Sequence, residues 1–402
     1  MIDALRRISG LAAGEFAGAY WGRAPLLRRA AQSPDGDFSD LLSCAAIDEL
    51  LSRRGLRTPF VRMTRYGEVI SPARYTRSGG AGAEIADQVA DDKVLAEFAA
   101  GATLVLQGLH RMWPPIVAFA GTLSAQLGHP VQVNAYLTPP MNQGLAPHYD
   151  VHDVFVVQFA GRKHWRVHEP VWALPLRDQP WNRRAAAVAA RSLEPPLIDT
   201  VLSCGDVLYL PRGYLHGAAS LGDVSGHLTI GIQPLTRQTL TTQIFAALSD
   251  DVELRRSLPA GVDLSDAAVL DGELTATIAA LRAALDRVDR AAVARGVGRH
   301  LAAATRPAPL RPLEQFALAA TLTPETSVVR RPGLHVTVRS EGTEVVLGLP
   351  DTEVRFAESV AAAVRTAISG VPVAAAALPG VDAAAGVELV ARLLRAGVVV
   401  PA

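Results

Sequence analysis

The 402-residue chain has very little cysteine. Its only two cysteines, Cys44 and Cys204, lie far apart in the sequence and form no closely spaced pair. This excludes a disulfide scaffold and a cysteine-rich zinc module. The chain also lacks a net charge, because 39 basic residues balance 39 acidic ones. Its overall charge therefore indicates neither nucleic-acid binding nor attachment to an anionic membrane.

Long apolar runs are also missing. No uninterrupted apolar stretch reaches the roughly 18–20 residues that span a bilayer. The first residues, MIDALRRISGLAAGEF, do not resemble a secretory signal, since they carry acidic residues and no long apolar segment. We therefore expect no membrane association and a cytoplasmic location. The hydrophobic fraction of 49% excludes a largely disordered chain, and the length allows two or three domains.

Two kinds of periodicity divide the first part of the chain. Up to about residue 125 the pattern is mostly helical, and helices are expected over residues 45–53, 84–101 and 114–127. From residue 131 to 234, short runs rich in Val, Phe, Tyr and Leu alternate with turn signals, which is typical of a β-barrel or sandwich. Residues 169–196 contain several prolines and a helical Arg-Ala run, and they indicate an inserted loop.

Helical periodicity returns after this β region. It continues to about residue 306 and ends at a Pro-rich linker, TRPAPLRP. The segment after the linker mixes helices with strand pairs and predicts a small winged-helix-like module. We therefore expect an α+β protein with three parts, which are residues 1–235, a helical region at 236–306 and a C-terminal domain at 307–402.

The residues most informative about chemistry lie within 134–170 and 205–218. His148 and Asp150 are two positions apart in a predicted strand, so both side chains are expected on one face. The segment GDVLYLPRGYLHGA predicts a strand, a tight turn and a return strand that carries His216. Two histidines and one carboxylate on one side of a cation leave three positions open, which suits iron(II) that activates dioxygen.

Other interpretations of these histidines stay open. The three residues can also be hydrogen-bonded members of a metal-free sheet, because His-x-Asp is a pattern that recurs by chance. His152 falls on the same predicted face and competes for the ligand role, although its place beside Asp153 favours the edge of the site. His164 and His168 flank a strand and are expected to be exposed, whereas His227 either lines the cavity or packs in it.

Lysine is the rarest basic residue. Only Lys93 and Lys163 are lysines among the 39 basic residues. A lysine in a chain that otherwise uses arginine is consistent with a site that fits a slim ammonium group better than a planar guanidinium. Chance is the alternative explanation.

Three stretches, NAYLTPP, GLAPHYDVHDVFVVQFAGRKHWRV and GDVLYLPRGYLHGA, resemble the JmjC-type ribosomal oxygenases, a cupin-like group of protein hydroxylases. The segment YWGRAPLLRR also resembles the opening of that group. The resemblance covers residues 10–235 well and the remainder more loosely. It implies a double-stranded β-helix, or jelly-roll, core with helical decoration, followed by a helical dimerisation region and a winged-helix-like domain.

The resemblance also assigns roles by position. It implies that Fe(II) is held by His148, Asp150 and His216, and that Lys163 binds the distal carboxylate of the co-substrate 2-oxoglutarate. A cation at this place is physically reasonable, since a buried carboxylate needs a charged partner.

Further contacts to the co-substrate are implied on two strands. Asn134 and Tyr136 match polar residues that face 2-oxoglutarate from an early strand. Relatives often have a hydroxyl residue in the last strand near the position of Gly231, and this chain offers only Thr229 or Ser225 there. Which of the two contacts the co-substrate, if either does, stays open.

The activity implied by the resemblance is 2-oxoglutarate-dependent hydroxylation of an arginine or histidine in a ribosomal or other protein, by a homodimer. Alternatives are an oxygenase of small metabolites or natural-product peptides, a cupin of another class without a keto acid, and a non-catalytic regulatory binding protein. We expect no direct nucleic-acid contact, because acidic residues follow Arg330 and Arg331 closely. A loop is the candidate for a substrate groove, with an ordinary solvated loop as the alternative; it contains Arg65, Tyr66, Arg74 and Tyr75.

Overall fold

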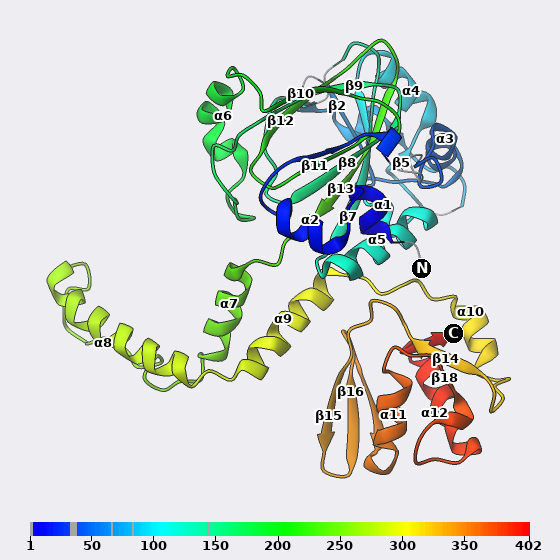
Figure 1. Cartoon of the computed structure of the whole chain (residues 1–402), viewed down its shortest axis with the longest axis vertical. Helices are drawn as coiled ribbons and strands as arrows, with labels where there is room; N and C mark the ends of the chain where they lie inside the picture. Colours follow the sequence, from blue (N-terminus) through cyan, green and yellow to red (C-terminus); the bar gives the residue numbers. More distant parts are fainter. Residues whose placement is uncertain (1–2, 33–37, 66, 83, 143–144) are drawn as a thin grey trace. The chain divides into compact units, whose positions relative to one another are not determined.

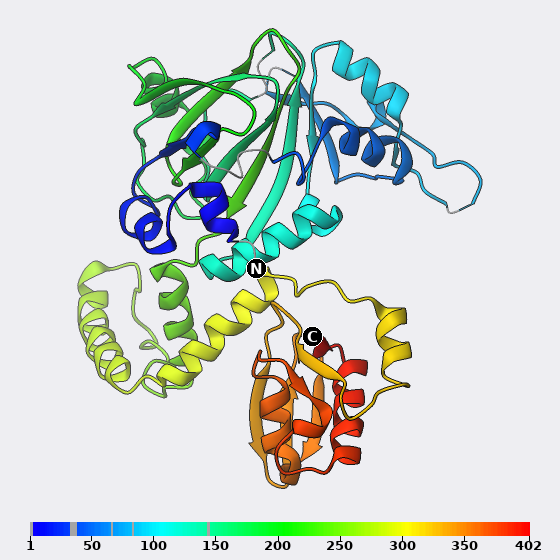
Figure 2. The same cartoon turned by 45° about the vertical axis from the view of Figure 1, so that its right-hand side comes forward.

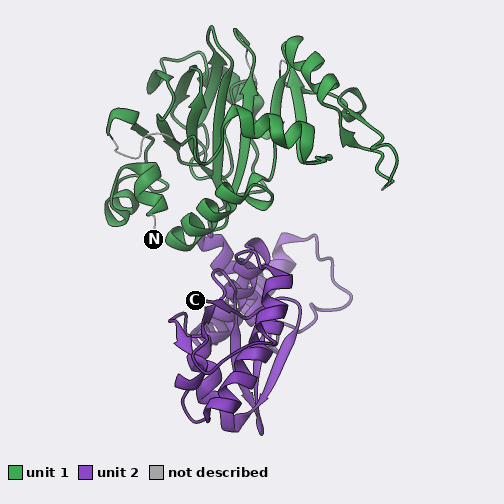
Figure 3. Cartoon of the chain, turned by 90° about the vertical axis from the view of Figure 1, so that its right-hand side faces the viewer, with its two compact units in different colours: residues 1–234 green, residues 235–402 purple. Residues whose placement is uncertain are grey.

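The chain divides into two compact units, Met1–Pro234 and Leu235–Ala402 (Figure 3). This computed structural model describes residues 3–32, 38–65, 67–82, 84–142 and 145–402. Among these residues no helix is both long enough and apolar enough to cross a membrane. The histidines and the aspartate singled out above all belong to the first unit.

An eight-stranded antiparallel sheet forms the larger wall of the first unit (Figure 1). In spatial order its strands are β1 (Leu26–Arg28), β11 (Val207–Leu210), β8 (Asp153–Ala160), β13 (Ser225–Ile232), β7 (Val131–Thr138), β6 (Thr103–Leu106), β2 (Val61–Arg65) and β3 (Glu68–Val69). The turn-punctuated runs after residue 131 are therefore strands, as the sequence predicts.

A second, three-stranded sheet faces the first. Its strands are β10 (Ile198–Leu202), β9 (Lys163–His168) and β12 (Leu215–Ser220), again in spatial order. Val154 and Leu208 of the large sheet share one buried apolar cluster with Trp165 and Leu202 of the small sheet. The chain passes from one sheet to the other between β8 and β9, β10 and β11, and β11 and β12, so the two sheets form the walls of a barrel.

Strand β7 illustrates how the sequence sets the two faces of the large sheet. Val133, Ala135 and Leu137 are buried in the main apolar core on the outer face. Asn134 and Tyr136 alternate with them, so they lie on the face toward the barrel interior. This alternation places polar side chains of β7 inside the barrel.

The outer face of the large sheet shares the main core with five helices, and Figure 2 shows two of them, α1 and α5, alongside the sheet. The five helices are α1 (Ala4–Ser9), α2 (Ala13–Ala19), α3 (Cys44–Arg53), α4 (Asp91–Ala99) and α5 (Pro114–Leu127). Helices α3 and α5 lie where the sequence predicts them.

The helix expected over residues 84–101 is wrong in its first part. Strand β5 (Gln88–Val89) pairs there with β4 (Thr76–Arg77), and α4 begins only at Asp91. Asp91 and Asp92 occupy the first turn of α4, where negative charge interacts favourably with the helix dipole. The strand pairing joins residues that are not neighbours in sequence, Thr76 with Val89 and Arg77 with Gln88. Helical periodicity is a local pattern and cannot predict such a pairing.

The expected inserted loop between β9 and β10, residues 169–197, is present, and we call it the β9–β10 insertion. It contains a short 3₁₀ helix (Trp181–Arg184) that continues into α6 (Ala185–Arg191). Val188 of α6 packs against Tyr149 and Leu215 in a small apolar cluster. Since Leu215 belongs to β12, this cluster fixes the insertion to the small sheet.

The second unit begins with three helices, α7 (Arg237–Ala247), α8 (Ala267–Asp286) and α9 (Arg290–Ala304), of which α7 packs against α9. The elements that follow are α10 (Pro312–Leu318), β14 (Ser327–Arg330), β15 (Thr337–Glu341), β16 (Glu344–Gly348), β17 (Glu353–Ala357), α11 (Ala361–Ala367), β18 (Val373–Ala374), α12 (Ala383–Arg395) and β19 (Val399–Pro401).

Two three-stranded sheets organise this C-terminal segment. They are β15-β16-β17 and β18-β14-β19, and their buried residues join those of α11 and α12 in one apolar core. Leu334, which precedes β15, is also buried in that core. The expected linker, residues 305–312, forms neither helix nor strand up to residue 311, and its last residue, Pro312, begins α10.

Candidate metal centre

Three side chains converge at one end of the barrel. One ligand atom from each of His148, Asp150 and His216 lies within 4.8 Å of the other two. His216 Nε2 is 3.7 Å from Asp150 Oδ2, and the two imidazole ring centres are 4.5 Å apart. The 3.7 Å separation is compatible with two donor atoms that each lie about 2.1 Å from one cation.

The backbone reaches this arrangement in an unexpected way. His148 forms a single β-bridge with His216, in which each backbone N–H donates to the other residue's carbonyl, at 3.0 and 2.8 Å. Asp150 lies outside every strand. The prediction that alternation within one strand brings His148 and Asp150 together is therefore wrong. Pairing with β12, which carries His216 as predicted, brings the two histidines side by side.

Both imidazoles are oriented by backbone carbonyls. His148 Nδ1 is 2.8 Å from the carbonyl oxygen of Ala146, and His216 Nδ1 is 3.1 Å from that of Tyr214. Because a carbonyl oxygen only accepts, each Nδ1 must carry the proton, which leaves the Nε2 lone pair free to bind a metal. Histidines that bind metals are held in this manner.

The surroundings favour the protonation states that bind a cation. Burial, with a smaller contribution from the neighbouring His148, lowers the pKa of His216 to about 4, so this imidazole is neutral near pH 7. Burial by itself raises the pKa of Asp150, but His152, His216 and His148 outweigh it and hold the pKa below its usual value. A neutral imidazole and an ionised carboxylate are the forms that act as metal ligands.

Lys163 lies on β9 with its side chain inside the barrel. It is 3% exposed, and its Nζ donates a hydrogen bond to Thr138 Oγ1 at 3.1 Å. Thr138 also accepts a hydrogen bond from Thr103, at 3.2 Å, so its own hydroxyl proton is left to donate. Burial lowers the pKa of Lys163 to about 7. Thr138 is a functional candidate that the sequence reasoning missed, although it continues the alternation of Asn134 and Tyr136.

Two buried nitrogen atoms near Lys163 lack a partner in the described part of the chain. In the described part of the chain, Trp165 Nε1 and His227 Nδ1 have no hydrogen-bond partner. Trp165 and His227 pack edge to face at 5.4 Å, and His227 stacks on Tyr136 at 5.2 Å. Buried polar groups are nearly always satisfied, so these atoms indicate a polar ligand in the barrel. A donor set of ammonium, hydroxyl and indole N–H suits a carboxylate.

The other expected co-substrate contacts are less direct. Asn134 Oδ1 accepts a hydrogen bond from the backbone N–H of Gly108 at 3.0 Å. Thr229 lies opposite Asn134 in the pairing of β13 with β7 and is half-buried. The hydroxyl of Ser225 accepts a hydrogen bond from the side-chain amide of Gln158, at 2.9 Å, at the start of β13.

The remaining histidines occupy different environments. His152 is outside the three-residue cluster, and its Nε2 is 3.4 Å from the side-chain nitrogen of Gln132. His164 is partly exposed and contacts the carboxylate of Asp199. His168 was expected to be exposed but is only 4% exposed, and burial lowers its pKa. His227 lines the barrel interior, as one of its two predicted roles requires.

The loop that is the candidate for a substrate groove is held by ion pairs and by burial in the core. Arg65 Nη2 and Arg74 Nη2 both bind the carboxylate of Glu97, at 3.0 and 2.6 Å. Tyr75 is 1% exposed and belongs to the main core. Tyr66 lies outside the described residues. The described members of this loop therefore favour a structural role.

A buried carboxylate joins the two segments that carry the cluster. Asp153, at the start of β8, accepts hydrogen bonds from the hydroxyl of Tyr209 and from the backbone N–H of Arg212, both at 2.9 Å. The next backbone N–H, of Gly213, donates to the carbonyl of Asp150 at 3.0 Å. Asp153 thus holds the turn between β11 and β12, which positions His216, against the segment that contains Asp150.

Comparison with known proteins finds one family and several relatives. Residues 117–240 match the JmjC domain family. The chain is 32% identical over 254 residues to ribosomal oxygenase 1 of Gallus gallus, which covers 61% of this chain and 40% of that protein. It is 39% identical over 136 residues to the bifunctional lysine-specific demethylase and histidyl-hydroxylase NO66 of Drosophila erecta, which covers 32% and 20%. The chain thus spans less than half the length of these curated relatives.

Solved structures show the same fold over nearly the whole chain. The ribosomal oxygenase YcfD of Escherichia coli superposes with a TM-score of 0.52 at 17% identity, covering 98% of both chains. A structure of YcfD in complex with cobalt and 2-oxoglutarate superposes with a TM-score of 0.51 at 16% identity, covering 97% of this chain and 98% of that one. The expected cupin-like core of antiparallel strands with helical decoration is therefore confirmed.

Proposed function

We propose that this chain, a member of the JmjC-type ribosomal oxygenase family, is a 2-oxoglutarate- and Fe(II)-dependent oxygenase that hydroxylates a protein side chain. The observation that carries the proposal is the cluster of His148, Asp150 and His216 within one buried barrel that also holds Lys163. The relatives are named as ribosomal oxygenases and a histidyl-hydroxylase, which supports an arginine or histidine of a ribosomal protein as the target.

The donor set of the cluster fits iron(II). Two imidazole nitrogens and one carboxylate oxygen are the ligands of the facial arrangement that leaves open positions for other molecules. When bound, iron(II) supplies the activation of dioxygen and the coupled oxidation of 2-oxoglutarate to succinate and carbon dioxide. His148, Asp150 and His216 hold the ion, and the carbonyls of Ala146 and Tyr214 fix the two imidazole rings for it.

The interior beyond the cluster fits a dicarboxylate. Lys163, the hydroxyl of Thr138 and the indole N–H of Trp165 supply donors for the carboxylate distant from the metal. Asn134 and Tyr136 flank this space on β7, and Thr229 is the hydroxyl of β13 that we assign to it. Ser225 is the less suitable alternative, since its hydroxyl is already bonded to Gln158.

We further propose a homodimer with three functional parts, a catalytic domain at residues 1–235, a helical dimerisation region at 236–306 and a winged-helix-like domain at 307–402. The exposed apolar side chains of α7 and α8 support a dimer interface. Arg339 and Arg355 on the β15-β16-β17 sheet are paired with glutamates, which supports the absence of direct nucleic-acid binding. We also propose a cytoplasmic location.

Mass spectrometry tests the proposed activity. Candidate ribosomal proteins are incubated with the protein, iron(II), ascorbate and 2-oxoglutarate, and peptides are searched for a gain of one oxygen atom. Succinate formed in proportion to the modified peptide supports the proposal. Iron-dependent succinate formation that accompanies oxidation of a small metabolite alone favours an oxygenase of small metabolites. The absence of succinate formation favours a non-catalytic binding protein.

A further inference from the structure

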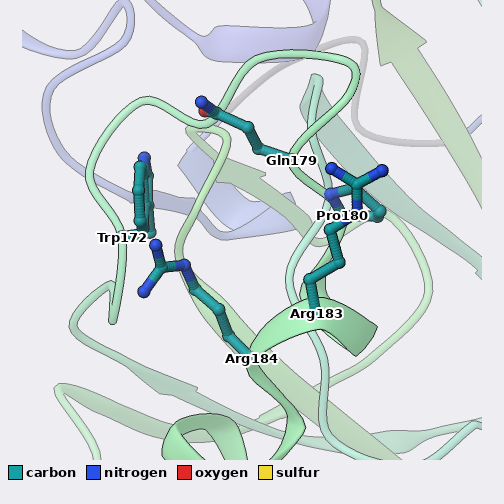
Figure 4. Close-up of a pocket in the computed structure, with 5 residues that line it drawn as sticks. All are labelled: Trp172, Gln179, Pro180, Arg183 and Arg184. Carbon is teal, nitrogen blue, oxygen red and sulfur yellow. The ribbon is translucent and has the colours of Figure 1, made fainter. Parts of the chain in front are cut away.

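The β9–β10 insertion carries a pocket that the proposed metal and co-substrate sites do not use. The pocket measures about 250 Å³ and is lined by Trp172, Gln179, Pro180, Arg183 and Arg184. Figure 4 shows the Trp172 and Gln179 side chains on the loop that precedes the short helix carrying Arg183 and Arg184. All five residues come from this one insertion.

The polar groups that line the pocket are hydrogen-bond donors. Arg184 stacks on the ring of Trp172, with its guanidinium carbon 3.2 Å from the ring centre, which holds the guanidinium in place. The side-chain oxygen of Gln179 accepts from the backbone N–H of Leu176 at 2.9 Å, so its NH₂ group is left to donate. Within the described part of the chain, neither Arg183 nor Arg184 forms an ion pair. The pocket therefore suits an anion.

The pocket is attached to both segments that carry the candidate metal ligands. The hydroxyl of Tyr149, which lies between His148 and Asp150 in sequence, donates to the backbone carbonyl of Gln179 at 3.0 Å. The ring of Trp181 is 6.3 Å from that of His148. The insertion that carries the pocket therefore contacts the segment that holds His148 and Asp150.

The turn before His216 supplies the second attachment. Gly213 has a φ of +92° and approaches Trp172 so closely that an added Cβ would lie 2.6 Å from the carbonyl oxygen of Trp172. A glycine is needed at this position for both reasons. The wall of the pocket formed by Trp172 is thereby held against the turn that positions His216.

We propose that this pocket binds a carboxylate side chain of the protein substrate, an aspartate or glutamate close in sequence to the residue that is presented to the metal. The inference rests on the proposed function for the identity of its occupant. Arg183 and Arg184 both line this recess, and arginine forms paired hydrogen bonds with a carboxylate. A nucleic-acid backbone requires an extended basic surface, whereas Asp178 adjoins the pocket and the chain has no net positive charge.

Direct binding tests the pocket. Two fluorescein-labelled peptides with a central arginine, one flanked by glutamates and one by glutamines, are titrated with the full chain under anaerobic conditions with iron(II) and 2-oxoglutarate. Fluorescence anisotropy is expected to show about fivefold tighter binding of the glutamate peptide, since exposed charge pairs are individually modest. In the double variant Arg183→Gln/Arg184→Gln this preference is lost, and in Arg183→Glu/Arg184→Glu it is reversed. The control Arg177→Gln, in the same insertion but outside the pocket, retains the preference.

Three results separate the possible outcomes. Equal binding of the two peptides, or a preference that survives in a folded double variant, overturns the inference. Tighter binding of a single-stranded RNA oligonucleotide that depends on the same two arginines overturns it in favour of nucleic acid. A glutamate preference in a protein that forms no succinate supports the pocket while it refutes the proposed oxygenase activity, so the two failures are distinguishable.

Discussion

At the level of single side chains, the candidate ligands are prepared for a cation by their neighbours. The carbonyls of Ala146 and Tyr214 fix the tautomers of His148 and His216, so that both Nε2 atoms are available. Burial keeps His216 neutral by lowering its pKa to about 4. His216 and Asp150 are therefore in the protonation states that bind a metal near pH 7.

Removal of a ligand is the first prediction. His148→Ala and Asp150→Ala are each expected to lower iron(II) affinity and succinate formation at least about 100-fold, since loss of groups that merely support a ligand already costs 10–100-fold. Iron content by elemental analysis and succinate by mass spectrometry measure the effect. His164→Ala is the matched control, because His164 contacts Asp199 and lies outside the cluster. Normal iron content in both ligand variants would show that the metal lies elsewhere.

The second prediction concerns Lys163. Replacement by alanine is expected to raise the KM for 2-oxoglutarate on the order of 10–100-fold, because a charge-assisted hydrogen bond to a carboxylate is worth about 1.5–3 kcal/mol. Steady-state kinetics with varied 2-oxoglutarate measures this change. Lys93→Ala provides the control, since the half-buried Lys93 bonds only to backbone carbonyls. An unaltered KM in Lys163→Ala would place the co-substrate anchor elsewhere.

The third prediction follows from the pKa of the same lysine. Burial lowers the pKa of Lys163 from 10.5 to about 7, so the ammonium form that binds a carboxylate predominates below pH 7 and is lost as the pH rises above it. The affinity of the protein for 2-oxoglutarate should therefore fall between pH 7 and pH 9. Calorimetric titration in buffers of different ionisation enthalpy should show proton uptake on binding at pH 8. Lys163→Arg keeps its charge over this range and should remove the pH dependence.

The residues predicted from the sequence are those whose chemistry is local and specific. His148, Asp150 and His216 were identified from residue type, spacing and family resemblance, and the structure brings the three together. Thr138 and Asp153 were not identified, because a threonine or an aspartate in a strand has no distinctive pattern. Their importance depends on pairing between distant strands, such as the hydrogen bond of Asp153 to Tyr209.

At the level of elements, strands and helices with strong periodicity were predicted well and non-local pairings were not. Helix α5 and the strands after residue 131 follow their sequence patterns. The start of α4 was misplaced, since β5 pairs with β4 across an intervening loop. The strand predicted to contain His148 and Asp150 is also wrong. His148 forms a single β-bridge, and its partner, His216, lies 68 positions later in the sequence.

The turn between β11 and β12 gives the fourth prediction. Asp153→Asn keeps the shape of the side chain but replaces one acceptor oxygen by a donor, which then faces either Tyr209 or the N–H of Arg212. We expect a loss of about 1–3 kcal/mol in the free energy of unfolding, measured by urea denaturation. Iron(II) affinity should fall about 10–100-fold as the turn that positions His216 loosens.

Tyr209→Phe is the comparison for this variant. It removes the hydrogen bond to Asp153 and the one that the Tyr209 hydroxyl accepts from the N–H of Gly22, but leaves the bond between Asp153 and the N–H of Arg212 in place. We expect it to lower stability while iron(II) affinity is retained. Equal losses of iron affinity in the two variants would show that the effect is general destabilisation and that Asp153 does not act through the turn.

At the scale of the whole molecule, α8 is difficult to explain within a single chain. It is 20 residues long, and Ala284 is its only buried residue in the described part of the chain. Leu274 is 55% exposed and Ile278 is 47% exposed. Most helices are stabilised by packing of an apolar face rather than by intrinsic propensity. The exposed apolar face therefore supports the proposed dimer interface.

Introduction of negative charge on that apolar face gives the last prediction. The variant Leu274→Asp/Ile278→Asp is expected to convert a dimer into a monomer, because each aspartate would be desolvated in an apolar interface without a partner. Sedimentation velocity measures the molecular mass of both proteins. Leu313→Asp is the matched control, since Leu313 is equally apolar, 86% exposed and located on α10, outside the helical region. If the wild-type chain sediments as a monomer, α8 has another partner; if the double variant stays dimeric while Leu313→Asp does not, the interface belongs to the C-terminal segment.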